Sequence, residues 1–294
     1  MPMNGGKLRR LRRIIDEAGR TVILPLDLIV PLGPSDGARN TGKLIDMAAE
    51  AGVSAVILRW GEAKRHAKRL DAALGLVVRL TGATGLRDGN PPQVLMHTVR
   101  ASVGIGADAV CVDLELGDGR EIESLRALAQ ICEEGEAFGI VVMAEVHVPD
   151  AAALRGTNRA DALAWAARTA RELGADLVKV AYPGSGDGIA TICELAGIPV
   201  VVAGGTRRNP REALRIADEA LRGGACGTAF GRNVIEHDAP YAMQRALSEL
   251  VRNRRPLEQV YELLDNCAAE MRDGVAQRQV ELTGSPTRRA SGRS

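Results

Sequence analysis

The sequence predicts a single-domain α/β fold, the (β/α)8 or TIM barrel, on three observations. Eight short runs rich in valine, isoleucine and leucine recur along the chain, each bounded by glycine, aspartate or proline. The stretches between them place apolar residues at helical spacing. Several runs are almost continuously apolar, as parallel strands buried on both faces are. An open, doubly wound sheet is the alternative, but no GxGxxG motif follows the first run, which weakens its nucleotide-binding versions.

The predicted strands follow one another in chain order. They are residues 21–27, 53–60, 74–81, 107–116, 139–147, 175–182, 198–205 and 225–232. Three segments between them carry the apolar stripe of a helix that covers a sheet, at residues 125–138, 162–173 and 210–224. The glycine- and proline-rich segment 81–92 is expected to be a loop or turn at a barrel mouth.

The ends of the chain differ from its middle in composition. We expect a basic helical segment over residues 1–20, the barrel over 21–251, a further helix over 252–281 and a disordered tail over 282–294, where apolar residues are almost absent.

Composition excludes several classes of function. The 38 basic and 37 acidic residues nearly cancel, so charge alone gives no reason to bind nucleic acid or an anionic membrane. No apolar run is long enough to span a bilayer, and the basic start lacks the apolar core of a signal peptide. The five cysteines form no CxxC pair and indicate neither disulfides nor a zinc site. We expect a cytoplasmic enzyme.

Lys179 is the sharpest candidate for chemistry. The chain has only five lysines, and this one stands inside the apolar run Leu177-Val178-Lys179-Val180-Ala181. A charged ammonium in such a strand is costly unless it is paired or neutralised. One interpretation is a structural ion pair with a core carboxylate; the other is a nucleophilic amine that attacks a ketone.

Acid and base groups stand near the ends of other predicted strands. Asp27 ends the first strand, Asp113 and Glu115 lie two apart on the fourth, and Glu145 and His147 lie two apart on the fifth. Residues two apart on a strand share a face, so each pair can act at one site. Proton transfer in Schiff-base chemistry needs such groups. A metal site built from Asp113, Glu115, Glu145 and His147 is the alternative, and it would imply Lewis-acid catalysis.

Glycine-rich turns follow the last two strands. Gly204 and Gly205 follow the seventh strand, and Gly231 and Arg232 follow the eighth. Backbone N–H groups at such glycines can approach an anion, and phosphate sites recur at these two loops in TIM barrels. We therefore expect a phosphorylated substrate.

These motifs together resemble a known family, the class I aldolases of the archaeal fructose-bisphosphate aldolase type, which includes 2-amino-3,7-dideoxy-D-threo-hept-6-ulosonate synthase. The resemblance runs from about residue 6 to residue 251. Its markers in chain order are KLRRLRRIIDEAGRTVILPLD with GPSDG, then GADAVCVDLELG, GADLVKVAYPG, VVVAGGT and GTAFGRNV.

The resemblance implies roles for particular residues. Lys179 corresponds to the lysine that forms the Schiff base, and Asp27 to the aspartate that assists proton transfer. The glycines and Arg232 correspond to the phosphate loops. Leu28 stands where the family usually has histidine. His147 occupies the place of a tyrosine acid/base, with Glu145 on the same face, so the acid/base assignment stays open between these two.

The family suggests a lyase of the aldehyde-lyase class that needs no metal or organic cofactor and forms a homo-oligomer. The leading hypothesis is an aldolase acting on a phosphorylated ketose or dihydroxyacetone phosphate, with fructose 1,6-bisphosphate as the default substrate. A biosynthetic aldolase or transaldolase is also open, either ulosonate synthase-like or joining dihydroxyacetone phosphate to aspartate semialdehyde. A thiolase acting on a phosphorylated diketone and a non-catalytic barrel that binds sugar phosphate are open as well.

Overall fold

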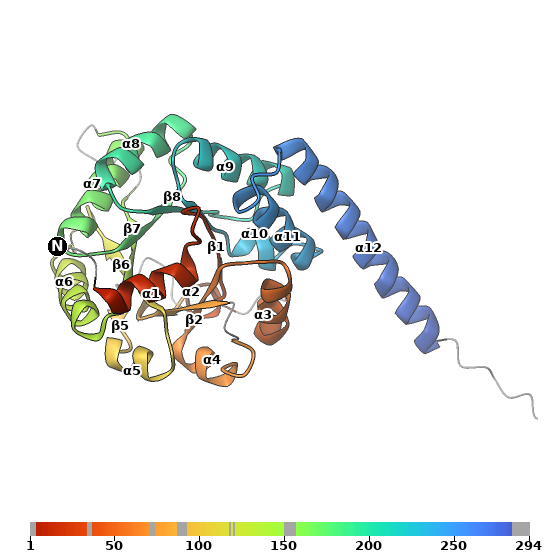
Figure 1. Ribbon diagram of the computed structural model, residues 1–294, viewed down its shortest axis with the longest axis horizontal. Helices are drawn as coiled ribbons and strands as arrows, with labels where there is room; N and C mark the ends of the chain where they lie inside the picture. The colour runs from red at the N-terminus through yellow and green to blue at the C-terminus, as the bar shows by residue number, and fades with distance from the viewer. Residues whose placement is uncertain are drawn as a thin grey trace, which may run out of the picture.

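The computed structural model describes residues 4–33, 37–70, 74–86, 93–117, 119, 121–149 and 157–283. Eight parallel strands close into a barrel in the order β1-β10-β9-β8-β7-β6-β3-β2 (Figure 1). They are β1 (Thr21–Pro25), β2 (Ala55–Arg59), β3 (Gly75–Arg79), β6 (Ala109–Glu115), β7 (Val141–His147), β8 (Leu177–Ala181), β9 (Val200–Ala203) and β10 (Gly227–Ala229). Each predicted apolar run contains one of these strands, which confirms the TIM barrel.

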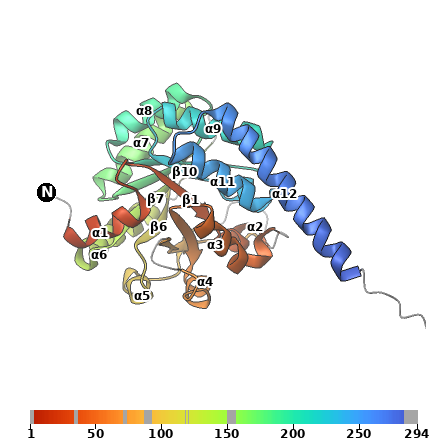
Figure 2. The same ribbon diagram turned by 45° about the vertical axis from the view of Figure 1, so that its right-hand side comes forward.

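Helices surround the barrel (Figures 1 and 2). They are α1 (Gly5–Ile14), α2 (Ile29–Leu32), a 3₁₀ helix (Gly37–Asn40), α3 (Thr41–Glu50), α4 (Trp60–Arg65), α5 (Val99–Gly104), α6 (Glu121–Phe138), α7 (Arg159–Glu172), α8 (Gly186–Ala196), α9 (Pro210–Arg222), α10 (Arg232–Ile235), α11 (Pro240–Val251) and α12 (Leu257–Thr283). Side-chain caps fix several starts: Asn158, Ser185 and Asn209 accept hydrogen bonds from backbone N–H groups in the first turns of α7, α8 and α9.

Strand alternation divides the apolar side chains into two clusters. One cluster lies between strands and helices and includes Val56, Val112 and Val178. The other fills the barrel interior and includes Ile57, Cys111 and Leu177, each one residue before a member of the first cluster or one after it. The interior is therefore packed, and polar groups can gather only where the strands end.

Helix α1 covers the amino-terminal end of the barrel. Ile14 and Ile15 belong to the interior cluster. Lys7 is fully buried, and its Nζ lies 2.6 Å from Glu136 Oε1 and 2.9 Å from Asp176 Oδ2. Asp176 immediately precedes β8, so this ion pair fastens α1 to the strand starts. The opposite, carboxyl-terminal end is left for the site.

Part of the predicted mouth loop forms a short sheet instead. β4 (Thr81–Gly82) pairs antiparallel with β5 (Val94–Leu95). Thr81 and Gly82 continue the chain just beyond β3, so the pairing begins where the barrel strand stops. The intervening residues 87–92 lie outside the described part of the chain.

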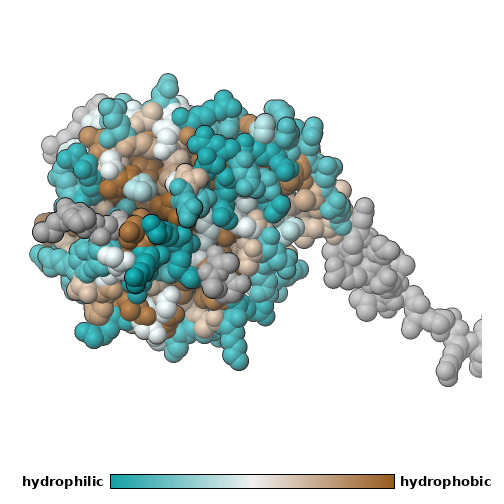
Figure 3. Space-filling model, in the orientation of Figure 1, coloured by the Kyte–Doolittle hydropathy of each residue, from teal (hydrophilic) through white to brown (hydrophobic). Residues whose placement is uncertain are grey.

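Helix α12 runs from α11 and α9 away from the barrel in both views (Figures 1 and 2). The predicted disordered tail lies outside the described residues from residue 284 on. Hydrophilic side chains cover much of the face in Figure 3, with apolar patches among them. Among the described helices, none combines the length and apolar character needed to cross a bilayer.

Candidate active site

A layer of charged side chains, called the charged layer below, lies on top of the apolar barrel interior at the carboxyl ends of the strands. Arg59, Arg79, Asp113, Glu145 and Lys179 each lie two residues beyond an apolar residue of the interior cluster, so they share its inward face. Strand register places Asp113 beside Glu145, and Glu145 beside Lys179. Candidate residues from three strands thus meet at one place, as a TIM-barrel active site requires.

Lys179 makes an ion pair with Glu145. The lysine is 5% exposed, and its Nζ lies 2.7 Å from Glu145 Oε1. A carboxylate at this distance can accept a proton from the ammonium or from an adduct on the nitrogen. Both sequence interpretations of Lys179 therefore have their partner in Glu145.

Arg79, which the sequence analysis missed, joins three of the carboxylates. Its Nε donates to Asp27 Oδ2 at 2.8 Å, its Nη1 donates to Asp113 Oδ1 at 3.0 Å, and its Nη2 donates to Glu145 Oε2. The forked guanidinium has five N–H donors, which lets one buried cation serve three anions. Burial by itself would lower the pKa of Arg79, but the three carboxylates hold it above its ordinary value.

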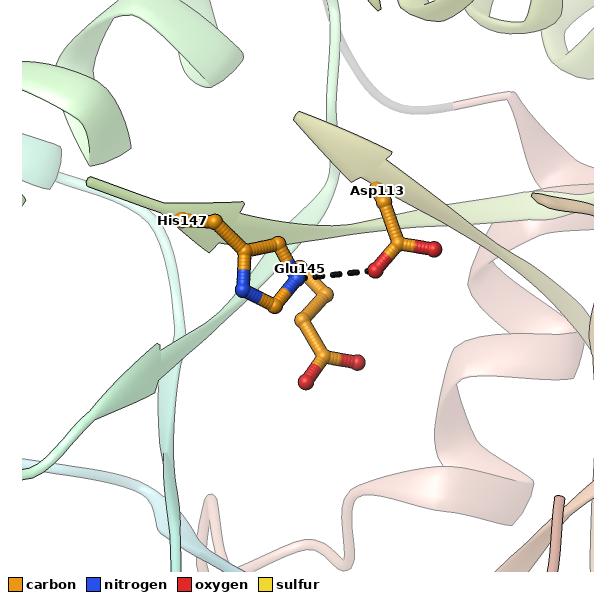
Figure 4. Close-up of side chains that lie close together, drawn as sticks. All are labelled: Asp113, Glu145 and His147. Carbon is orange, nitrogen blue, oxygen red and sulfur yellow. Dashed lines mark hydrogen bonds and ion pairs between the residues drawn. The ribbon is translucent and has the colours of Figure 1, made fainter. Parts of the chain in front are cut away.

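Asp113 carries His147 at the mouth of the barrel. His147 Nε2 lies 2.8 Å from Asp113 Oδ1 (Figure 4). The hydroxyl of Thr81 donates to Asp113 Oδ2 and accepts from the Asp113 backbone N–H at 2.9 Å. Nearly half of the His147 side chain is exposed, so the ring can reach a ligand while Asp113 orients it.

The hydrogen bonds and ion pairs around Arg79 shift the pKa values of three acid/base groups: Glu145, Asp113 and His147. Burial would raise the pKa of Glu145, but Arg79 and Lys179 lower it to about 2. Burial would also raise the pKa of Asp113, but Arg79 and the hydrogen bond from His147 hold it well below its usual range. Loss of solvent opposes the charged form of His147, yet the hydrogen bond and charge of Asp113 raise its pKa. At neutral pH both acids are carboxylates, and His147 keeps its proton to higher pH than free histidine does.

Asp113, Glu145 and His147 also offer ligand atoms that lie within 4.8 Å of one another, as a metal site would need. The same two carboxylates already bond to Arg79, and Glu145 bonds to Lys179 as well. A divalent ion placed among them would face two fixed cations in a nearly buried space, so the arrangement suits proton transfer better than metal binding.

Two further predicted residues occupy different positions. Asp27 is buried, and its Oδ1 has no hydrogen-bond partner among the described residues, which leaves that oxygen for a ligand. Glu115 is buried at the end of β6, in register with His147 rather than with Lys179. Asp27 therefore joins the carboxylate network through Arg79. Glu115 lies two residues beyond Asp113 on β6, beside His147.

The two glycine loops are tied together by Asn233. Its Nδ2 donates to Gly204 O at 2.9 Å and to Thr206 O at 3.2 Å, and its Oδ1 accepts from Arg208 N at 2.8 Å. A Cβ at Gly204 would lie 2.7 Å from Asn233 Nδ2, and Gly205 has a φ of +68°, so both positions require glycine. The sequence patterns indicate the glycines but give no signal for this asparagine.

The remaining two predicted residues lie at the start of α10. Gly231 is buried and caps α10, which begins at Arg232, and Arg232 is half-buried with no ion pair to another described residue. The four predicted phosphate residues thus lie on two adjacent strand ends, β9 and β10, next to β8 and Lys179.

The chain is similar to proteins of known activity over most of its length. A family model described as DeoC/LacD family aldolase matches residues 21–237. The 2-amino-3,7-dideoxy-D-threo-hept-6-ulosonate synthase 1 of Archaeoglobus fulgidus is 33% identical over 263 residues, covering 89% of this chain and 96% of that relative. The 2-amino-4,5-dihydroxy-6-oxo-7-(phosphonooxy)heptanoate synthase of Streptomyces griseus is 32% identical, covering 84% of this chain and 89% of its own.

Solved structures agree with these relatives. A Schiff base forming fructose-1,6-bisphosphate aldolase superposes with a TM-score of 0.75 at 29% identity, covering 83% of this chain and 99% of its own. The chain therefore belongs to the DeoC/LacD family of aldolases, and it is a class I aldolase.

Proposed function

We propose that this aldolase forms a Schiff base between Lys179 and a phosphorylated ketose or dihydroxyacetone phosphate, and makes or breaks the adjoining C–C bond. The observation that carries the proposal is the buried Lys179 ammonium, 2.7 Å from Glu145 Oε1, at the carboxyl end of a barrel strand.

The first steps use Lys179 and Glu145. The ammonium gives a proton to Glu145, and the free amine attacks the ketone carbon to give a carbinolamine. Protonated Glu145 returns its proton to the carbinolamine oxygen, which leaves as water and so forms the iminium. The Glu145 carboxylate then takes a proton from the neighbouring carbon, which gives an enamine whose carbon attacks an aldehyde; cleavage runs the same steps backward. Water finally hydrolyses the product iminium and frees Lys179.

His147 is the proposed acid at the new hydroxyl. In the direction of synthesis the aldehyde oxygen becomes an alkoxide and takes one proton, which protonated His147 can give because Asp113 stabilises its charged form. Asp27 Oδ1, without a partner among the described residues, is available to accept a substrate hydroxyl. The choice between Glu145 and His147 thus becomes a division of roles between the lysine nitrogen and the aldehyde oxygen.

The substrate phosphate is assigned to the loops of Gly204, Gly205, Gly231 and Arg232. Asn233 holds the β9 loop against α10 and so fixes the backbone N–H groups of both turns. The Arg232 guanidinium, without an ion pair among the described residues, supplies a positive charge beside them.

Fructose 1,6-bisphosphate cleavage and biosynthetic addition share these steps and differ in the aldehyde. The name of the Streptomyces griseus relative describes a product with a phosphonooxy group at one end and an amino acid at the other. Scission between its two hydroxyl-bearing carbons gives dihydroxyacetone phosphate and an amino-acid semialdehyde. The sequence similarity supports such an aldehyde as a second candidate acceptor.

Borohydride trapping tests the proposal. Wild-type protein incubated with dihydroxyacetone phosphate and reduced should gain one stable adduct, and peptide mass spectrometry should place it on Lys179. Lys7, buried at the other end of the barrel, is the internal control and should stay unmodified. No adduct, or an adduct shared among several lysines, would refute the assignment.

The pH dependence of His147 gives a second prediction. Because Asp113 raises its pKa, His147 should titrate above the ordinary value of about 6.5. As an acid it is active below that pKa, so kcat/KM for synthesis should fall as pH rises through it. In Asp113→Asn the pKa of His147 and this fall should both move to lower pH, because the hydrogen bond and charge of Asp113 are lost.

The chain has only four histidines, so proton NMR can follow the imidazole signal of His147 through its titration. A His147→Gln variant identifies the resonance to follow. The role of Asp113 is contradicted if His147 titrates at or below 6.5 in the wild type, or if Asp113→Asn leaves its midpoint unchanged.

We also infer a homo-oligomer in the cytoplasm. Trp165 on α7 and Leu195 on α8 are exposed apolar side chains on two helices that pack together, which supports a contact between copies. All five cysteines are free thiols, which is typical of a reducing compartment.

A further inference from the structure

Arg59 lies in the charged layer but outside the carboxylate network. It ends β2, pairs in register with Arg79, and is half-buried. Its Nη1 donates to Thr81 O at 2.6 Å and contacts Met96 Sδ at 3.5 Å. No carboxylate among the described residues makes an ion pair with it, whereas Arg79 beside it has three.

One edge of this guanidinium is unused. The Nε is buried without a hydrogen-bond partner among the described residues, and Nη2 donates to none of them. Nε–H and Nη2–H point the same way, and together they form the fork that binds the two oxygens of a carboxylate. The bond from Nη1 to Thr81 fixes the plane in which this fork lies.

The surroundings leave room for this guanidinium. A Cβ at Gly82 would lie 2.3 Å from Arg59 Nη1 and 2.8 Å from Nη2, so only glycine permits the observed position. Thr81, which holds Arg59 through its carbonyl, also bonds to Asp113 through its hydroxyl. Thr81 therefore fixes the position of Arg59 relative to Asp113 and the rest of the charged layer.

The charge at Arg59 is only partly compensated. Burial lowers its pKa, and Arg79 adds to that effect, while Asp27 and Asp113 oppose it. His97 nearby has a lowered pKa, through burial and the charge of Arg59, so it adds no positive charge at neutral pH. The positive charge that remains at Arg59 suits a ligand group with a negative charge.

In the closed strand order, β2 lies opposite β8, with three strands between them in either direction. With the ketone held by Lys179 and the loops after β9 and β10, an acceptor that extends across the mouth from Lys179 reaches the side of the barrel on which Arg59 lies. We propose that Arg59 binds the carboxylate of the acceptor aldehyde and so selects carboxylate-bearing aldehydes.

This inference rests on the proposed Schiff-base addition and names the acceptor class for it. The test compares two aldehydes that differ in one charge, succinic semialdehyde and its methyl ester, in addition to dihydroxyacetone phosphate. The wild type should prefer the acid. Arg59→Gln should lower kcat/KM for the acid by about 10- to 100-fold, mainly through KM, and bring the acid-to-ester ratio close to 1.

Arg65→Gln is the matched control, since it removes the same charge six residues later from an exposed side chain. Its acid-to-ester ratio should equal that of the wild type. A parallel loss with acid and ester in Arg59→Gln would overturn the proposal, because it would show a structural role. Glyceraldehyde 3-phosphate is a third acceptor for the same assay, and a loss in Arg59→Gln confined to this aldehyde would overturn the proposal as well, in favour of a phosphate site.

Two readouts separate this inference from the proposed function. Adduct formation with dihydroxyacetone phosphate on Lys179 tests the Schiff base in each protein without an acceptor. Succinate binding, followed by saturation-transfer NMR, tests the Arg59 site without turnover: it should be lost in Arg59→Gln and retained in Arg65→Gln. Equal succinate binding by the wild type and Arg59→Gln refutes the carboxylate site even where no adduct forms.

Discussion

Replacing Lys179 by alanine is expected to lower turnover by about 10⁴-fold or more, because the covalent route loses its nucleophile. The barrel itself should persist. Glu145 keeps its bond to Arg79 through the other carboxylate oxygen, so the substitution leaves no isolated buried charge. The measurement is the rate of aldol cleavage and synthesis, together with the thermal midpoint of unfolding.

Two controls separate loss of the nucleophile from a general effect of removing a lysine or from loss of ligand binding. Lys43→Ala removes an exposed lysine on α3 and should leave turnover at the wild-type level. Calorimetric binding of dihydroxyacetone phosphate should weaken in Lys179→Ala but not disappear, since the glycine loops remain. Turnover within tenfold of the wild type in Lys179→Ala would refute the lysine mechanism. A wild type that binds the phosphate without turnover would instead support a sugar-phosphate sensor.

The barrel and its lysine could be predicted from the sequence for one physical reason. A parallel strand buried on both faces must be almost wholly apolar, so strands appear as short apolar runs and a charge within one of them stands out. Lys179 was conspicuous because lysine is rare in this chain. Arg79 stands in an equally apolar run, but arginines are frequent here, and its position carried no comparable signal.

Other parts of the site depend on contacts that spacing does not encode. Asp113 and Glu115 share a face in the sequence, and only the register with β7 places one beside Glu145 and the other beside His147. Asn233 donates a buried hydrogen bond to the backbone oxygen of Gly204, which lies 29 positions earlier in the sequence. Such long-range pairs follow from closure of the barrel, which local patterns do not specify.

Replacing Arg79 by methionine is expected to lower the free energy of unfolding by about 3–5 kcal/mol at pH 7. Three carboxylates would lose a partner that is 5% exposed. Asp27 would be affected most, since Oδ2 bonds to Arg79 and Oδ1 has no partner among the described residues. Arg79→Lys should recover part of the loss, because one ammonium cannot reach all three carboxylates at once.

The loss should depend on pH in a defined direction. In the wild type the pKa of Glu145 is depressed to about 2, so its carboxylate stabilises the fold above the unfolded value of about 4.3, and this contribution disappears as pH falls toward 2. Without Arg79, the pKa of Asp113 loses its largest lowering influence, and burial acts against only the hydrogen bonds from His147 and Thr81, so the charged form of Asp113 is less favourable at neutral pH. Protonation removes that cost, and the difference between wild type and Arg79→Met should shrink from pH 7 to pH 4.

Urea unfolding at both pH values measures this difference. Arg168→Met is the matched control, because it breaks an exposed ion pair with Glu172 on α7 and should cost less than about 1 kcal/mol at either pH. If Arg79→Met matched Arg168→Met, the buried cation would not hold the three carboxylates together. A large loss that was equal at pH 7 and pH 4 would point to packing around the arginine stem rather than to charge. The expected result, a large loss at pH 7 that shrinks at pH 4, would identify Arg79 as the residue that keeps Asp113 and Glu145 ionised in the barrel.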